Sequence, residues 1–260
     1  MLLSDLRAIV TGGGRGIGRA IARRFAREGA AVLVAARTAR EVEAVAQEIR
    51  AAGGRAASLA ADVAQEQECG RIYHFAVEAL GGVDVLVNNA GVLGPVRAVQ
   101  EISAGEWDAV MAVNLRSAFL LSRLVLPGML ERGRGAILNI SSVAAKGAFG
   151  FNGPYAASKA GLLALTRTLA AETGRKGVRV NAICPGPVPE TAMSQELGTR
   201  LGERFGKKPE EVLEGAVRGI LQGRAQSAEE VAAAAVFLCS EQASAITGQA
   251  LLVDGGMLFG

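Results

Sequence analysis

The sequence predicts an α/β fold with a parallel sheet covered by helices on both faces. Short apolar runs alternate along the chain with longer stretches whose apolar residues recur at helical spacing. Strands that alternate with helices build parallel sheets, because the chain must cross over before the next strand. The first apolar run ends in a glycine-rich segment, and a helical pattern follows it at once. No repeat, low-complexity tract or linker interrupts residues 1–260, so we expect one domain.

Each expected strand is a short apolar run that stops at glycine, asparagine, serine, aspartate or proline. The expected strands are Arg7–Thr11, Ala31–Ala35, Arg55–Ala60, Val83–Val87, Gly135–Ile140, Val178–Ile183 and Ala250–Val253. The expected helices are Arg19–Glu28, Ala39–Ala52, Gln65–Leu80, Glu106–Glu131, Tyr155–Thr173 and a last one that runs to Leu238 behind the capping box Ser227–Glu230. Residues 187 to about 224 are charged, punctuated by glycine and only partly periodic, so we expect a mobile substrate-covering segment.

Composition excludes several classes of protein. Half of the residues are hydrophobic and the formal net charge is only +3, with acids and bases mixed along the chain, so no nucleic-acid partner is expected. Three dispersed cysteines predict reduced thiols and a cytoplasmic location. The single histidine, His74, excludes a metal site with several histidine ligands, and we expect no metal. No uninterrupted apolar run approaches the roughly 18 residues of a membrane span, so we expect no membrane segment.

The glycine-rich segment predicts a phosphate site. It reads Thr-Gly-x-x-x-Gly-x-Gly, with Thr11, Gly12, Gly16 and Gly18 at the fixed positions. In the order strand, turn and helix, the free N–H groups of the helix N-terminus face the turn, which suits a pyrophosphate. The alternative is a plain tight connection.

The end of the second strand predicts the cofactor. A dinucleotide-binding fold places an acid here against the ribose 2′-hydroxyl, but the chain has Ala36, Arg37 and Thr38. Arg37 and Arg15 together suit a 2′-phosphate, and Thr38 adds a hydroxyl. We therefore expect NADP(H) as the preferred cofactor and NAD(H) as the second choice. The alternative is a pair of solvent-exposed arginines.

Tyr155 and Lys159 lie four residues apart in a helical stretch, on one face and one turn apart. A lysine cation held close favours the phenolate, so the pair could exchange a proton with an alcohol oxygen near neutral pH. Taken alone, the pair is also typical of a surface contact. Asn89 and Gly91 follow a strand at the sheet edge where ligands bind, although asparagine there is also ordinary turn chemistry. Asn114, inside a long helix, leaves the burial of its face open.

Together these residues resemble the short-chain dehydrogenase/reductase family over essentially the whole chain. The motifs that carry the resemblance are the glycine turn at 11–18, Asp62, Asn88-Asn89-Ala90-Gly91, Asn114, Ser142, Tyr155-x-x-x-Lys159, Pro185-Gly186 and the closing Val253-Asp254-Gly255-Gly256. The resemblance implies a single Rossmann-type, doubly wound domain with a seven-stranded parallel sheet, a nicotinamide dinucleotide cofactor and a homotetramer, with a homodimer as the alternative.

The resemblance also implies residue roles. The catalytic tetrad would be Asn114, Ser142, Tyr155 and Lys159, with Ser141 structural and Asn114 holding a water. The implied cofactor site, together with the glycine turn, comprises Thr11, Gly12, Gly14, Arg15, Gly16, Ile17, Gly18, Arg37, Thr38, Asp62, Val63, Asn89, Ala90, Gly91, Tyr155, Lys159, Pro185, Gly186, Val188 and Thr191. The usual spacing after Pro-Gly would place a threonine one residue earlier, so the cofactor contact of Thr191 stays open.

The resulting expectation is an NADPH-dependent reductase of a carbonyl group, most similar to 3-oxoacyl-(acyl carrier protein) reductases. Its substrate would be a small molecule or a group on an acyl carrier, which the basic side chains of Arg200, Arg204, Lys207 and Lys208 could attract; a solvated helix face would show the same pattern. One alternative is an NAD-linked dehydrogenase of a sugar, polyol or 3-hydroxy acid. A second, from another class, is a non-catalytic dinucleotide-binding sensor.

Overall fold

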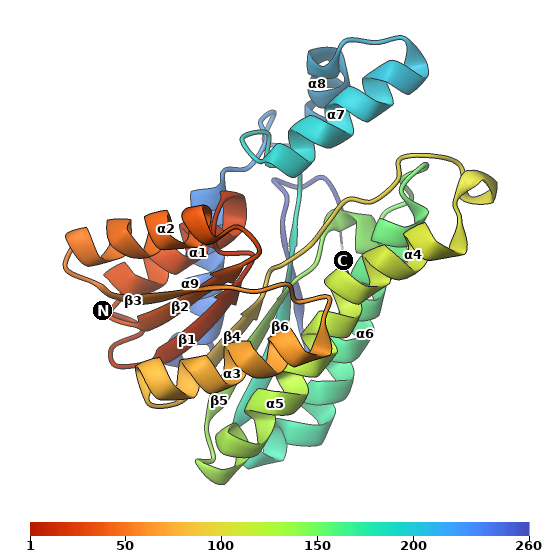
Figure 1. Ribbon diagram of the computed structural model, residues 1–260. Coiled ribbons are helices and arrows are strands. Elements are labelled where there is room, and N and C mark those ends of the chain that lie inside the picture. Colours follow the sequence, from red (N-terminus) through yellow and green to blue (C-terminus); the bar gives the residue numbers. More distant parts are fainter. Residues whose placement is uncertain (260) are drawn as a thin grey trace.

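The computed structural model describes residues 1–259, and these residues form one parallel sheet between two layers of helices (Figure 1). The described strands are β1 (Arg7–Thr11), β2 (Ala31–Ala36), β3 (Arg55–Ala60), β4 (Val85–Asn88), β5 (Gly135–Ile140), β6 (Val178–Pro185) and β7 (Ala250–Val253). Within residues 1–259 their order in the sheet is β3-β2-β1-β4-β5-β6-β7, and every neighbouring pair is parallel. This confirms the predicted doubly wound fold.

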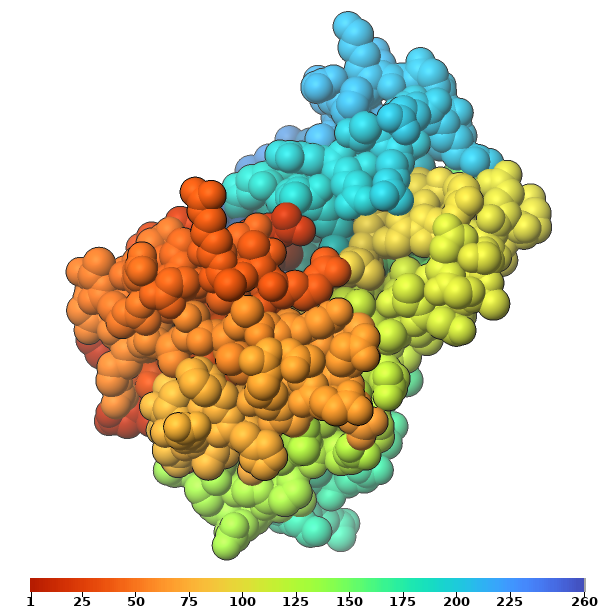
Figure 2. Space-filling model, in the orientation of Figure 1, coloured from red at the N-terminus to blue at the C-terminus, as the bar shows by residue number. Residues whose placement is uncertain are grey.

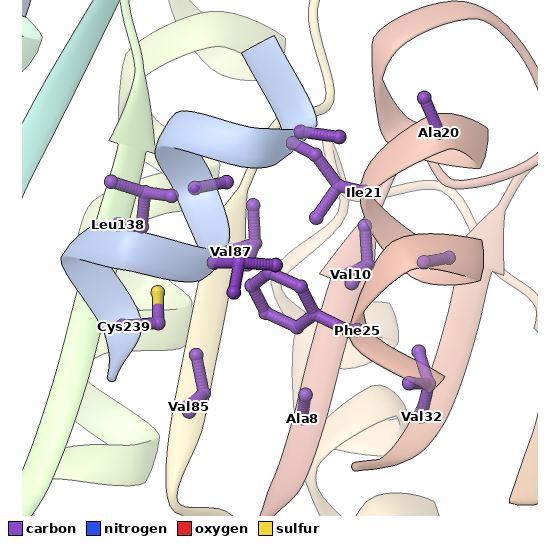
Figure 3. Packing of buried hydrophobic residues seen from close by; sticks show 14 of the residues in the cluster. Ala8, Val10, Ala20, Ile21, Phe25, Val32, Val85, Val87, Leu138 and Cys239 are labelled. Atoms are coloured by element: carbon purple, nitrogen blue, oxygen red, sulfur yellow. The ribbon is translucent and has the colours of Figure 1, made fainter. Parts of the chain in front are cut away.

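The helices pack on the sheet through amphipathic faces. Helices α1 (Gly16–Arg27), α2 (Ala39–Ala51) and α9 (Ala228–Cys239) share one hydrophobic cluster, and α3 (Glu66–Leu80), α5 (Ser117–Glu131) and α6 (Gly153–Thr173) belong to the opposite side. Figure 3 shows the first cluster, where Phe25 of α1 lies between Val10 of β1 and Val87 of β4. The predicted capping box opens α9, because Ser227 Oγ accepts from Glu230 N and Ser227 N donates to Glu230 Oε2.

The sheet order determines where a ligand can bind. The chain runs outward from β1 to β3, then returns to the other side of β1 with β4. At such a switch point the loops at the carboxyl ends of two adjacent strands separate, which opens a crevice. The glycine turn follows β1 and the asparagine segment follows β4, so both predicted motifs border this crevice.

At the opposite end of the sheet, Asp84 is almost fully buried and holds β1 in register with β4. Arg7 donates from Nε and Nη2 to the two carboxylate oxygens of Asp84, at 2.7 and 2.8 Å, and its main-chain N donates to the same group. Burial raises the pKa of the Asp84 carboxyl, but the hydrogen bonds and charge of Arg7 outweigh it and hold the pKa below its ordinary value. This pair stabilises the pairing of β1 with β4.

The structure refines two expectations about helices. The expected helix Glu106–Glu131 is present as one continuous helical stretch, in which α4 (Ala104–Met111) and α5 are joined by one π-helical turn at Ala112–Arg116. The partly periodic segment after residue 187 contains two helices, α7 (Ala192–Phe205) and α8 (Pro209–Arg218). Glycines 198 and 202 do not break α7, because α8 and the turn before it pack against them; a Cβ on Gly202 would lie 2.6 Å from the Lys207 carbonyl oxygen.

One described helical stretch, Ala104–Glu131, is long and apolar enough to cross a membrane by length and composition, with a mean hydropathy of 1.5 in its most apolar window. Its inner face belongs to the core between α3 and the sheet, where Leu120, Leu121 and Val125 are buried. The absence of a membrane segment therefore stays a prediction.

Candidate active site

The glycine turn forms a cradle at the N-terminus of α1. Gly12 and Gly16 adopt left-handed backbone conformations, with φ of 62° and 53°. A Cβ on Gly18 would lie 2.3 Å from the Gly12 carbonyl oxygen, so no side chain fits there. Arg15, the N-cap residue of α1, makes no side-chain hydrogen bond to the helix, which leaves the first N–H groups facing the cleft. This cradle fits the pyrophosphate of a dinucleotide cofactor.

Thr11 supports the cradle from behind. It is 1% exposed, and its hydroxyl donates to the Val87 carbonyl and accepts from the main-chain N–H groups of Asn89 and Ala90. The Asn89 side chain donates in return to the Thr11 carbonyl at 2.8 Å. Thr11 does not border the cleft, because its side chain joins β1 to the segment after β4; its predicted contact with the cofactor stays a prediction.

The remaining predicted cofactor residues line one continuous cleft. Among the described residues, those that border it and were predicted are Gly12, Gly14, Arg15, Gly16, Ile17, Gly18, Arg37, Thr38, Asp62, Val63, Asn89, Ala90, Gly91, Tyr155, Lys159, Pro185, Gly186, Val188 and Thr191. Arg37 stands where β2 ends, Arg15 lies in the glycine turn after β1, and Asp62 and Val63 follow the end of the neighbouring strand β3. The cleft thus runs from the arginines, along the glycine cradle, to Tyr155.

Some residues that line the cleft were not predicted from the sequence. Among the unpredicted lining residues that the structure describes, Glu41 is the charged residue. Glu41 lies in the first turn of α2, lines the cleft and approaches Arg15 to 3.9 Å. The local signal was its position four residues after Arg37, at the start of the helix that follows the second strand. That signal gives no contact with Arg15, which is 26 residues away in the chain.

Tyr155 and Lys159 stand one turn apart on α6, at the inner end of the cleft. Lys159 is 3% exposed, and its Nζ donates to the Ile140 carbonyl at 2.8 Å and lies 5.6 Å from the centre of the Tyr155 ring. Of the two serines after β5, Ser141 donates to the Lys159 carbonyl at 2.9 Å and so anchors α6. Ser142 lines the cleft beside Tyr155, and its Oγ accepts from the Ala144 N–H at 3.1 Å.

The pKa values of this pair differ from the sequence expectation. Burial raises the pKa of the Tyr155 phenol, and a hydrogen bond with Ser142 opposes this shift only partly. Burial also lowers the pKa of Lys159 to about 8, against a smaller opposite effect of Cys184. The expectation that Lys159 lowers the Tyr155 pKa does not hold in the protein alone, since desolvation dominates both groups. The phenol is therefore protonated at neutral pH, as a proton donor must be.

Asn114 occupies the π-helical turn and is 1% exposed. Its amide oxygen accepts from the Val92 N–H at 2.8 Å, and its amide nitrogen donates to the Val92 carbonyl at 2.9 Å and to Ser158 Oγ at 3.0 Å. A Cβ on Gly91 would lie 3.4 Å from Lys159 Nζ and 3.5 Å from the Asn114 oxygen, so this glycine keeps a small space open between the two. The side chain of Asn114 thus fixes the segment after β4 against α6.

The segment after β6 closes the inner wall of the cleft. A Cβ on Gly186 would lie 2.9 Å from Asp254 Cα, so the closing Asp-Gly-Gly motif packs directly on this turn. Thr191 is the N-cap of α7: its hydroxyl donates to the Val188 carbonyl at 2.9 Å and accepts from Ser194 N at 3.3 Å. Its methyl group faces Gly16 across the cleft. The one-residue offset therefore leaves Thr191 in the wall, with its hydroxyl engaged in the helix cap.

Helices α7 and α8 lie over the carboxyl end of the sheet (Figures 1 and 2). Arg200 donates to the Gly94 carbonyl at 2.8 Å, and Arg204 lies 3.4 Å from Glu101 and 4.4 Å from the centre of the Phe151 ring. These two arginines join α7 to the loops of the sheet domain, so in this structure they are engaged inside the protein. This weakens the expectation that they attract an acyl carrier.

These features define a dinucleotide-dependent oxidoreductase: a phosphate cradle at a sheet switch point, continuous with a half-buried tyrosine and a buried lysine and serine. Comparison with known proteins gives the family. A family model described as "Enoyl-(Acyl carrier protein) reductase" matches residues 11–258. The chain belongs to the short-chain dehydrogenase/reductase family, whose members are NAD(P)-dependent.

Three similar proteins show how far the likeness extends. The chain is 43% identical to the short-chain reductase protein NovJ of Streptomyces niveus, over 96% of this chain and 92% of that protein. It is 35% identical to the 3-oxoacyl-[acyl-carrier-protein] reductase FabG of Thermotoga maritima, over 99% and 100% of the two chains. A crystal structure of a single-substitution variant of actinorhodin polyketide ketoreductase with NADPH superposes with a TM-score of 0.93, at 38% identity and 99% coverage of both chains.

Proposed function

We propose that this protein reduces a ketone or a 3-oxoacyl group to a secondary alcohol, with NADPH as the hydride source and Tyr155 as the proton donor. The observation that carries the proposal is the position of a protonated, desolvated phenol beside Ser142, at the inner end of a cleft that begins in a phosphate cradle. Carbonyl reduction by this family is supported by the ketoreductases and the FabG reductase among the similar proteins.

NADPH is supported by charge at the outer end of the cleft. Arg15, from the glycine turn, and Arg37, from the end of β2, both line it, and Ala36 occupies the position of the acid that would bind a free ribose 2′-hydroxyl. Two guanidiniums suit a 2′-phosphate. The similar actinorhodin ketoreductase structure is one with NADPH.

In this mechanism the bound cofactor supplies the hydride to the carbonyl carbon, and the residues of the site handle the proton and position the reacting groups. Tyr155 gives its proton to the carbonyl oxygen as negative charge develops there, and Ser142 donates a hydrogen bond that positions the same oxygen. Lys159 uses one N–H donor on Ile140; two donors remain for the ribose hydroxyls of the cofactor, and its charge stabilises the phenolate that Tyr155 becomes. Asn114 holds the segment after β4 in place through its two hydrogen bonds to the Val92 main chain.

The test combines binding and turnover. Fluorescence titration compares NADPH with NADH, and turnover is then measured on β-keto esters, diketones, ketoses and acyl-carrier substrates. Tyr155→Phe should lower turnover by about 10²–10⁴-fold while NADPH still binds. Tyr73→Phe is the matched control, because Tyr73 lies on α3 away from the cleft and loses the same hydroxyl. Near-normal turnover of Tyr155→Phe on a verified substrate would contradict the mechanism.

We also propose that the protein is a homotetramer and that it is cytoplasmic. Sedimentation of the purified protein tests the first, and localisation of a tagged chain tests the second.

A further inference from the structure

The carboxylate of Glu41 lies at the outer end of the cofactor cleft, among the cations proposed to bind the cofactor phosphate. Its Oε1 is 3.9 Å from Arg15 Nη1, and both side chains retain solvent access, with 37% of Glu41 and 69% of Arg15 exposed. Glu41 also touches the glycine turn: a Cβ on Gly14 would lie 2.9 Å from Glu41 Cβ and 3.3 Å from its Oε2. The carboxylate is therefore held against the cradle itself.

An ordinary surface ion pair would have no effect on ligand binding, and the same two helices contain such a pair. Arg19 of α1 donates to Glu48 of α2 at 2.9 Å, but neither residue borders the cleft. Glu41, two helical turns earlier on α2, does border it. The two glutamates therefore carry the same charge on the same helix and differ in whether they face the ligand.

We infer that Glu41 is a counter-charge to Arg15 that lowers the affinity for NADPH and so limits the discrimination between NADPH and NADH. The inference rests on the proposed cofactor site. A 2′-phosphate that binds Arg15 must compete with the Glu41 carboxylate and remain near a like charge, which disfavours the phosphate. A cofactor with a free 2′-hydroxyl brings no charge to this place and is nearly unaffected.

The alternative role for Glu41 is the opposite one. A carboxylate near the end of β2 can accept hydrogen bonds from the ribose hydroxyls, which would favour NADH. Removing the charge then weakens NADH binding and leaves NADPH binding unchanged. The two roles predict changes in different ligands, so one set of titrations separates them.

The experiment is isothermal titration of the wild type, Glu41→Gln and Glu48→Gln with four ligands: NADPH, NADH, 2′,5′-ADP and 5′-AMP. Glu41→Gln should tighten NADPH and 2′,5′-ADP by about three- to tenfold, because a partly exposed charge acts through a high dielectric. NADH and 5′-AMP should change by less than about twofold, and Glu48→Gln should leave all four ligands within about twofold. The gain should shrink as salt is raised.

A second measurement tests the coupling. In an Arg15→Ala background the gain from Glu41→Gln should fall below about twofold, because the two residues act on one phosphate. The inference is overturned if Glu41→Gln tightens neither phosphate ligand, tightens both cofactors equally, or weakens NADH alone. A wild type that prefers NADH would refute the proposed cofactor, whereas the change in the NADPH-to-NADH ratio on Glu41→Gln would still decide the role of Glu41.

Discussion

Replacing Lys159 with methionine should make the cofactor-free protein more stable and inactive. Lys159 is 3% exposed, and burial lowers its pKa from 10.5 to about 8. At neutral pH the ammonium is still charged, so the fold contains a desolvated cation that donates a hydrogen bond to the Ile140 carbonyl. Methionine has a similar length and no charge to desolvate.

The magnitude follows from the lowered pKa. A pKa lowered from 10.5 to about 8 means that the charged Lys159 destabilises the folded protein by about 3 kcal/mol at pH 7, relative to a neutral amine at the same place. The methionine variant also loses the hydrogen bond to Ile140, which costs it about 1–2 kcal/mol of that gain. The free energy of unfolding of Lys159→Met should therefore exceed that of the wild type by about 1–2 kcal/mol at pH 7.

The gain should disappear at alkaline pH. Between about pH 8 and pH 10.5 the unfolded chain keeps the lysine proton and the folded protein has lost it, so the wild type becomes more stable as pH rises through this window. The methionine variant has no such proton. The stability difference is largest at and below pH 7 and shrinks above about pH 8.

Urea unfolding of the cofactor-free proteins at neutral and alkaline pH measures this difference. Lys176→Met is the control, because Lys176 is exposed and loses the same charge; its unfolding midpoint should match that of the wild type. A Lys159→Met variant that is less stable than the wild type at pH 7, or whose advantage does not change with pH, would refute the reasoning that desolvation dominates at Lys159.

Two further predictions concern buried polar groups. Asn114→Ala removes three hydrogen bonds, one of them to Ser158, and should lower the free energy of unfolding by about 2–4 kcal/mol, measured by urea unfolding. Ser117→Ala, which removes one hydrogen bond within the same helical stretch, should cost less than about 1.5 kcal/mol; equal losses would contradict the assignment. Asp84→Asn should cost about 3–5 kcal/mol at pH 7 because Arg7 loses its partner. The depressed Asp84 pKa means that this advantage of the wild type is present above about pH 4 and is lost as pH falls through the folded-state pKa. Unfolding midpoints of both proteins at neutral and acidic pH measure this change. A stability difference that does not change with pH would contradict the prediction.

The sequence by itself determined the order of strands and helices and the position of the main motifs. A buried strand is a local apolar run and a glycine turn is a local string, so β1, the cradle and the start of α1 follow from residues 7–27 alone. The spacing of Tyr155 and Lys159 also fixes their shared helix face, because helix geometry depends only on separation in the chain. The family resemblance then supplied the partners of this pair.

The tertiary structure decided what each side chain touches. Thr11 turned out to be a support behind the cradle, and Asn114 uses its amide on Val92 and Ser158. The glycines of α7 mark a packed contact with α8, whereas in the sequence they interrupt a pattern that is only partly periodic. Each of these contacts joins segments that local periodicity does not relate, or depends on the fit of two surfaces.

The same reason explains the electrostatics. The sequence places a cation one turn from a phenol and predicts a lowered phenol pKa. The structure buries Lys159 and half-buries Tyr155, and this desolvation moves the Tyr155 pKa upward and the Lys159 pKa downward. Likewise, only the folded chain brings Glu41 to Arg15. Desolvation and through-space charge depend on three-dimensional surroundings, so the residue types and their spacing identify the site, and the fold sets the protonation states with which it works.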